Sequence, residues 1–86
     1  MKIVWDEPKR RSNIDKHGID FVGVGEDFFA SAIIAPAKKG RVKALGRLGV
    51  HIVAVVFKPL GSEALSIISA RPASRKERKF VNDQSE

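Results

Sequence analysis

The sequence predicts an α+β domain, a small antiparallel sheet with two N-terminal helices and a C-terminal helix in the order β-α-α-β-β-β-β-α. The main observation is that helical segments lie near the two ends of the chain, while four strand-like segments follow one another between them. Such segregation favours an α+β layer over a parallel α/β fold. With 86 residues the chain has room for one core, so residues 1–86 are expected to form a single domain.

The N-terminal third is expected to supply one strand and two helices. Lys2 to Trp5 is a short candidate strand, and Pro8 in an acidic first turn predicts a helix that runs to about His17. Gly18 then stops this helix, because glycine readily adopts the left-handed conformation found at helix C-termini. Asp20 is a suitable N-cap for a second helix, although two glycines within that helix weaken it. Its apolar residues recur at helical spacing: Phe21, Val24 and Phe28.

Four strand segments follow, separated by turn residues. They span residues 31–35, 41–47, 50–58 and 64–71. Side chains alternate along the second segment, so its basic residues share one face of the sheet with Leu45. One face of the sheet is expected to pack under the helices. The basic stripe is then expected to line an open, polar second face.

The end of the chain predicts a charged helix. Pro72 ends the last strand, because proline cannot donate a ladder hydrogen bond. Ser74 and Glu77 stand three residues apart, which is the spacing of a capping box, and the helix is expected to run through about Val81. Glu77 is also a candidate catalytic base, but the capping box already accounts for it.

Basic residues are concentrated in two windows of the sequence. The chain carries a net charge of +6, while residues 38–47 contribute +5 and residues 71–79 contribute +4. The rest of the chain is therefore slightly acidic. Two concentrated basic zones are the pattern expected for a polyanionic partner, most often nucleic acid. The alternative is a charged surface that serves solubility alone.

Other features of the composition exclude several classes of protein. The chain has no cysteine, so it has neither disulfides nor a thiolate metal site. Its longest apolar run, Ile52 to Phe57, is too short to cross a membrane, and no signal-peptide pattern opens the chain. Its two histidines are far apart in sequence and its carboxylates lie mostly near helix starts, so no metal site and no cofactor are expected. We expect a cytoplasmic protein with no membrane partner.

Three blocks of the sequence resemble the BrnT family of bacterial toxins. The first holds Trp5-Asp6, Lys9, Asn13 and residues 16–21, with the sequence KHGIDF. The second is residues 40–47, GRVKALGR, and the third is residues 68–78, ISARPASRKER. The blocks occur in the family's order and together span nearly the whole chain.

This resemblance implies a RelE-like fold and an endoribonuclease that arrests translation and growth. It also implies neutralisation by a cognate antitoxin with a ribbon-helix-helix DNA-binding domain, so that toxin and antitoxin form a hetero-oligomer. DNA would then be a partner only indirectly, through the antitoxin. Composition and periodicity alone reach only a small α+β domain with a basic face.

Cleavage of RNA without a metal ion requires a proton acceptor, a proton donor and cations. The substrate's own 2′-hydroxyl is the nucleophile, and the cations offset the charge of the phosphorane. Arg71 is the first candidate for transition-state stabilisation, because a guanidinium holds two phosphate oxygens in a fixed fork; its alternative role is a salt bridge. His17 is the candidate general acid or base, with a purely structural role at the helix end as its alternative. His51, at the start of an apolar strand, is interpreted as structural.

Further cations are candidates for binding the RNA chain. Arg41 and Lys43 are expected beside the reacting phosphate, unless they only form a solvated strand face. The phosphates on either side are expected to contact Lys38, Lys39, Arg47, Arg75 and Lys76. Two other classes of function remain open from the residues: a toxin of the same fold that poisons a protein target such as a topoisomerase, and a non-catalytic nucleic-acid-binding module.

Overall fold

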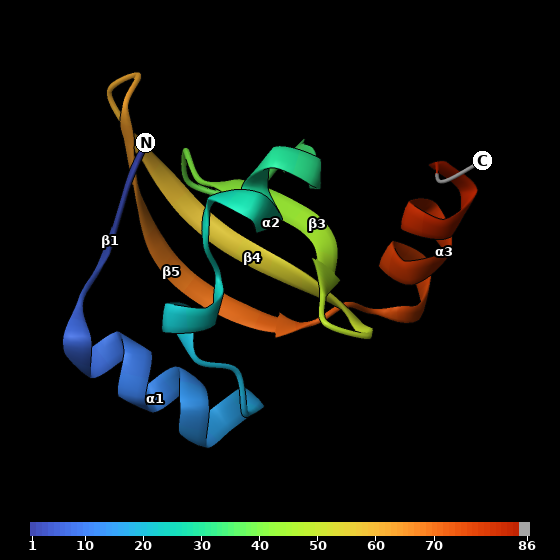
Figure 1. Ribbon diagram of the computed structural model, residues 1–86, viewed down its shortest axis with the longest axis horizontal. Coiled ribbons are helices and arrows are strands. Elements are labelled where there is room, and N and C mark those ends of the chain that lie inside the picture. Colours follow the sequence, from blue (N-terminus) through green and yellow to red (C-terminus); the bar gives the residue numbers. More distant parts are fainter. Residues whose placement is uncertain (85–86) are drawn as a thin grey trace.

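The computed structural model describes residues 1–84, which form one five-stranded sheet flanked by helices (Figure 1). The elements in chain order are β1 (Lys2–Trp5), α1 (Glu7–His17), the 3₁₀ turn η1 (Phe21–Gly23), α2 (Glu26–Ser31), β2 (Ile33–Pro36), β3 (Val42–Leu48), β4 (His51–Leu60), β5 (Ala64–Pro72) and α3 (Arg75–Gln84). The strand order in the sheet is β1-β5-β4-β3-β2. The predicted α+β class and element order are confirmed, with boundaries that differ by a few residues.

One edge of the sheet differs from the prediction of an antiparallel sheet. Strands β2 to β5 pair antiparallel, whereas β1 pairs parallel to β5, with Lys2 beside Ala64 and Trp5 beside Ile67. A strand pattern of four residues does not indicate whether the strand pairs parallel or antiparallel with its neighbour. The direction follows instead from packing, because Ile3 and Trp5 lie against the core in this arrangement.

The second predicted helix is broken in two. The Asp20 side chain accepts a hydrogen bond from the Val22 backbone N–H and opens only the short turn η1. The backbone leaves the helical region at Val24, and α2 begins after Gly25. The low helix propensity of the glycines explains the break. The three predicted apolar residues, Phe21, Val24 and Phe28, are nevertheless all buried.

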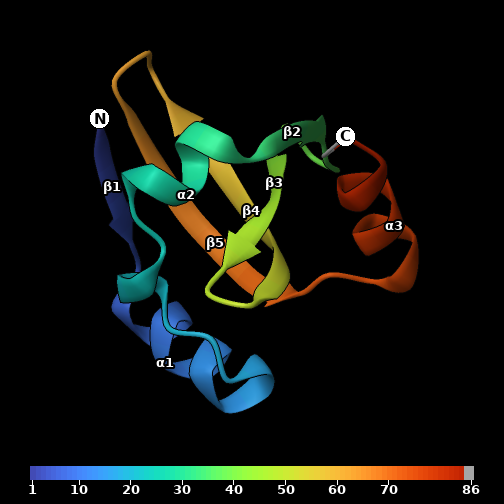
Figure 2. The ribbon, with the colours of Figure 1, turned by 45° about the vertical axis from the view of Figure 1, so that its right-hand side comes forward.

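The sheet separates two apolar clusters. Elements η1 and α2 cover one face, where Phe21 and Phe28 pack on Val53, Val55 and Ile67. Helix α3 lies on the opposite side of the sheet from α1 and α2 (Figure 2). There it packs Val81 against Leu45 and Ala54.

The expectation of an open second face is therefore wrong. Leu45 stands within the basic stripe and is only 4% exposed, because α3 folds back over it. A charged helix can do this since a single apolar residue, Val81, is directed at the sheet. The helix also extends past the expected end at Val81 to Gln84.

Helix α1 is attached to the sheet mainly through one amide. It has almost no apolar stripe, and Asn13 is its one buried residue. The Asn13 side chain donates to the carbonyls of Ile19 and Ala70, both at 2.8 Å, and accepts from the Ala70 N–H at 3.0 Å. Strand β1 pairs with β5 only as far as Ile67. The Asn13 amide therefore satisfies the backbone N–H and carbonyl of Ala70, which a neighbouring strand would otherwise do.

We expect Asn13→Ala to lower the free energy of unfolding by about 1–3 kcal/mol, because it leaves the buried polar groups of Ala70 without partners. Urea denaturation at pH 7 measures the change. The matched control is Ser12→Ala, an exposed neighbour on α1, for which a change within about 0.5 kcal/mol is expected. Equal stability of the two variants would show that Asn13 does not hold α1 in place.

Candidate functional site

Glu77 joins α3 to the sheet. The capping box predicted from the sequence is present: the Ser74 N–H donates to Glu77 Oε1 at 2.8 Å, and the Glu77 N–H donates to Ser74 Oγ at 3.1 Å. The same carboxylate accepts two hydrogen bonds from Arg71, at 2.7 and 3.0 Å, and one from Lys43 Nζ at 2.9 Å. A helix cap and a cross-sheet ion-pair cluster thus share one side chain.

These contacts determine the charge states in the cluster. Hydrogen bonds from Arg71, from the Ser74 backbone and from Lys43 hold the pKa of Glu77 far below its ordinary value, against the opposing effect of burial. The bonds to Glu77 in turn raise the pKa of Arg71. Glu77 is therefore a firmly ionised carboxylate, which is unsuited to accept a proton near neutral pH.

Two of the predicted catalytic residues meet in this cluster, but neither is a free cation. Arg71 and Lys43 come from β5 and β3, and both bind Glu77. Arg71 has a side chain that is 35% exposed, and both of its terminal nitrogens are engaged. The salt bridge considered as the alternative role of Arg71 is therefore present. One positive charge remains in excess among the three side chains.

A cavity of about 720 Å³ lies at the end of the β3–β4 hairpin. Its walls are the loop that follows α1, the hairpin turn, and the first two turns of α3 with the segment leading into it. We call it the hairpin-end pocket. Its floor is apolar, with contributions from Leu48, Ile52 and Pro72. Its polar lining residues are His17, Asp20, Arg47, His51, Arg78 and Asn82.

Local structure positions each polar wall of this pocket. His17 is the last residue of α1, and Gly18 ends the helix with a φ of 71° while its N–H donates to the Ile14 carbonyl. Arg47 donates to the Asn82 side chain at 3.1 Å, which ties the end of β3 to α3. Arg78 donates to the Ala73 carbonyl at 2.8 Å.

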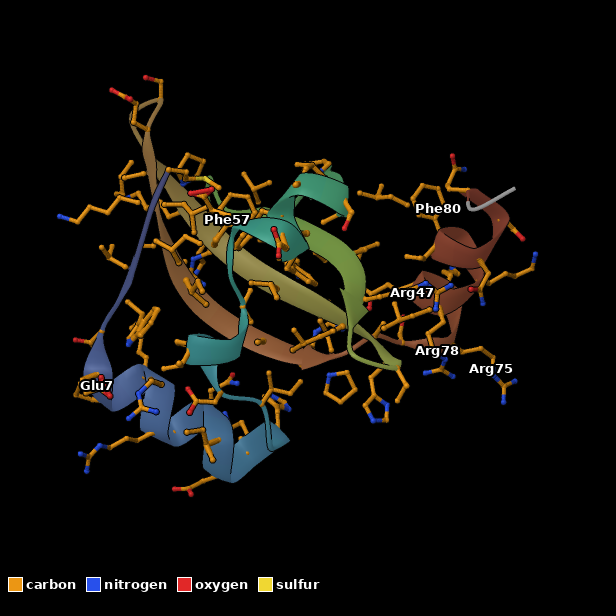
Figure 3. The ribbon with its side chains drawn as sticks, in the orientation of Figure 1. Glu7, Arg47, Phe57, Arg75, Arg78 and Phe80 are labelled. Atoms are coloured by element: carbon orange, nitrogen blue, oxygen red, sulfur yellow. The ribbon has the colours of Figure 1, made fainter. Side chains whose placement is uncertain are left out.

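The arginines near this pocket differ in their orientation. Arg47 and Arg78 lie close together between the hairpin end and α3, while Arg75 points outward from the helix (Figure 3). Cavities that are apolar with a few convergent polar groups are typical small-molecule or cofactor sites. The hairpin-end pocket is therefore the stronger candidate site, with the Glu77 cluster as its neighbour.

The other predicted site residues, including the candidate catalytic Arg41, lie away from the pocket. Lys38, Lys39 and Arg41 are exposed in the β2–β3 loop, at the opposite end of β3 from Arg47. Arg75 and Lys76 are exposed in the first turn of α3. The predicted stripe is thus interrupted, because Leu45 is buried and its neighbours on the same face bond to α3.

Sequence reasoning missed four polar residues of the pocket, one of which, Asp20, was predicted only as a helix N-cap. His51 was interpreted as structural because it opens an apolar strand, yet it is exposed. Arg78 contributed to a basic window without a site role, and Asn82 carried no signal. The position of His51 next to a hairpin turn was the available clue, because side chains at hairpin ends are accessible.

In residues 1–84 no group of three or more His, Cys, Asp or Glu side chains is arranged to hold a metal ion. No helix within the same range is long and apolar enough to cross a membrane.

Two comparisons identify similar proteins. Residues 5–77 match the model of a family described as the ribonuclease toxin BrnT of type II toxin–antitoxin systems. The crystal structure of the Brucella abortus ribonuclease toxin BrnT superposes with a TM-score of 0.81 at 56% sequence identity, covering 87% of this chain and 99% of that chain. None of the curated proteins matches the chain.

We expect Glu77→Gln to lower the free energy of unfolding by about 1–3 kcal/mol at pH 7, because hydrogen bonds to a charged group are lost. The folded-state pKa of Glu77 is depressed, so this stabilisation is present above its unfolded value of about 4.5 and is lost as the pH falls. Urea denaturation of both proteins at pH 7 and pH 3 measures the free energy of unfolding. The difference in this free energy between wild type and Glu77→Gln should be smaller at pH 3 than at pH 7.

The matched control is Glu63→Gln, because the Glu63 side chain is exposed and makes no ion pair among the described residues. It should change stability by less than about 0.5 kcal/mol at either pH. A Glu77→Gln variant as stable as this control at pH 7 would show that Glu77 does not anchor α3.

Proposed function

The chain belongs to the BrnT family of ribonuclease toxins from type II toxin–antitoxin systems, and we propose that it cleaves RNA without a metal ion at the hairpin-end pocket. The observation that carries this proposal is the lining of the pocket, where an imidazole faces the same cavity as two guanidinium groups. An imidazole transfers protons near neutral pH, and guanidinium groups offset developing charge on a phosphate. These are the functions that metal-free RNA cleavage needs.

His17, Lys43 and Arg71 are proposed as the residues that act on the reacting phosphate and its neighbours, while Arg41, at the opposite end of β3 from the pocket, is proposed to hold the RNA chain. His17 transfers a proton within the pocket. Arg71 is not among the residues that line the pocket, but it lies next to Pro72, which does; a phosphate of the RNA beside the pocket is proposed to exchange with the Glu77 carboxylate at the Arg71 fork. Lys43 shares Glu77 with Arg71 and is released by the same exchange.

Exposed cations in and around the pocket are proposed to hold the RNA chain on either side. Arg47 lines the pocket, while Lys38 and Lys39 extend the path along β3 and Arg75 and Lys76 extend it along α3. Each phosphate contact of this kind adds affinity that falls with rising salt. Cleavage of RNA in the cytoplasm arrests translation and thereby growth.

We expect purified protein to cleave RNA in excess EDTA, because the proposed mechanism uses only protein side chains and the 2′-hydroxyl of the substrate. Gel analysis of a defined RNA measures the rate. Arg47→Ala should lower it about tenfold or more, because a cation facing the developing charge is lost, while the free energy of unfolding falls by no more than about 0.5–1.5 kcal/mol for the lost hydrogen bond to Asn82. A matched control is Lys58→Ala on the far end of β4.

Activity that disappears in EDTA and returns with magnesium would contradict metal independence. Binding without cleavage would favour a non-catalytic module. If RNA is neither bound nor cut while growth still stops, the toxin acts on a protein target instead.

The cognate antitoxin is proposed to carry a ribbon-helix-helix DNA-binding domain and to cover the basic surface. Two basic zones on an otherwise slightly acidic chain are a favourable docking surface for acidic side chains. A partner seated there excludes RNA by occupying the same cations. The toxin then contacts operator DNA only through the antitoxin.

We expect complex formation with this antitoxin to block cleavage and to protect Lys38, Lys39 and Lys76 from acylation by a lysine-reactive reagent. Mass spectrometry of the modified lysines provides the measurement. Lys9 and Lys58 are the internal controls, because both are exposed but lie outside the basic zones. Protection of the controls, with the three basic-zone lysines still reactive, would place the antitoxin on another surface.

A further inference from the structure

We propose that His51 is a second catalytic residue in the hairpin-end pocket, where it accepts the proton of the RNA 2′-hydroxyl while His17 donates a proton to the departing 5′-oxygen. This inference rests on the proposed function and assigns its two proton transfers. It also changes the interpretation of His51 from a structural strand residue to a group that contacts substrate.

The sheet register directs His51 toward the face that carries His17. His51 pairs with Leu48 across the β3–β4 hairpin, and directly opposite residues of an antiparallel pair lie on one face. Leu48 packs against the cluster formed with η1 and α2, so His51 is on that side of the sheet. Helix α1 ends in His17, and the Asn13 side chain of this helix binds the Ile19 carbonyl in the loop that follows it. Both imidazoles line one cavity.

The histidines are the pocket side chains best suited to accept a proton. Among residues 1–84, Asp20 is the one carboxylate that lines the pocket, but it accepts hydrogen bonds from the Val22 N–H and from Arg10 at 2.9 Å. These contacts lower the pKa of Asp20, so it is a poor base. Neither imidazole forms a hydrogen bond or ion pair within the described residues, which leaves both free for a substrate.

The charged groups around the two imidazoles come from three parts of the chain. Asp20 faces them from the loop after α1, Arg47 from β3 and Arg78 from α3. A phosphate between the histidines would therefore meet guanidinium groups arriving from the α3 side. Such preorganised donors stabilise the charge that develops on the phosphorane.

The position of His17 assigns the two roles. It stands in the last turn of α1, where the helix dipole favours a positive charge, and we assign it the proton-donating role. His51 lies on a strand next to a cationic wall, and we assign it the proton-accepting role.

The proposed step balances in protons and bonds. His51 removes the 2′-hydroxyl proton, the 2′-oxygen forms a bond to phosphorus, the bond from phosphorus to the 5′-oxygen breaks, and the 5′-oxygen takes the proton of His17. The products are a 2′,3′-cyclic phosphate and a 5′-hydroxyl. Exchange of protons with water then restores both side chains.

The test compares His51→Gln and His17→Gln on two RNA substrates that each have one cleavable linkage. One substrate carries the natural 5′-oxygen leaving group and the other a 5′-sulfur, which departs without being protonated. On the natural substrate both variants should lose about 10²–10⁴ in rate. On the sulfur substrate His17→Gln should recover most of its rate, whereas His51→Gln should stay impaired.

Each enzyme serves as its own control, because the ratio of rates on the two substrates does not depend on the fraction that is folded. Lys58→Gln, on the far end of the same strand, should match wild type on both substrates. The proposal is overturned if His51→Gln cleaves the natural substrate within about threefold of wild type, or if the sulfur substrate restores its activity. A wild-type protein that cleaves neither substrate would instead contradict the proposed function itself.

Discussion

The hydrogen bonds of the Asn13 side chain are the constraint on which the site depends. Helix α1 is too polar to be held by apolar packing, and one buried amide connects it both to β5 at Ala70 and to its own following loop at Ile19. This contact fixes where the C-terminal end of α1 lies relative to the β3–β4 hairpin. The separation of His17 from His51, and therefore the shape of the pocket, follows from that position.

A second polar anchor fixes the other wall. Glu77 closes the capping box of α3 and binds Arg71 and Lys43, so the helix is held in register over the sheet with Val81 on Leu45. In this register Arg78 faces the pocket rather than solvent alone. Two small polar networks, instead of a large core, position the side chains proposed for catalysis.

The predictable parts of the structure were those set by local physics. The capping box, the glycine stop of α1 and the burial of Phe21, Val24 and Phe28 each follow from a few neighbouring residues. Three features required tertiary information: the parallel pairing of β1, the return of α3 over Leu45, and the exposure of His51. The candidate site was predicted only in part, because a pocket assembled from four elements has no signature in any one of them.

Capture of Arg71 by Glu77 also refines the proposed role of the cations. A free guanidinium fork would bind any phosphate, whereas one already bound to a carboxylate binds only where the exchange is favourable.

The most direct test of this account is an NMR titration of the imidazole ¹H–¹⁵N signals with a 2′-O-methyl RNA, which binds but cannot be cleaved. We expect the signals of both His17 and His51 to shift and to saturate together. Shifts confined to residues 38–41 and the outer surface of α3, with both imidazoles unchanged at saturation, would contradict it.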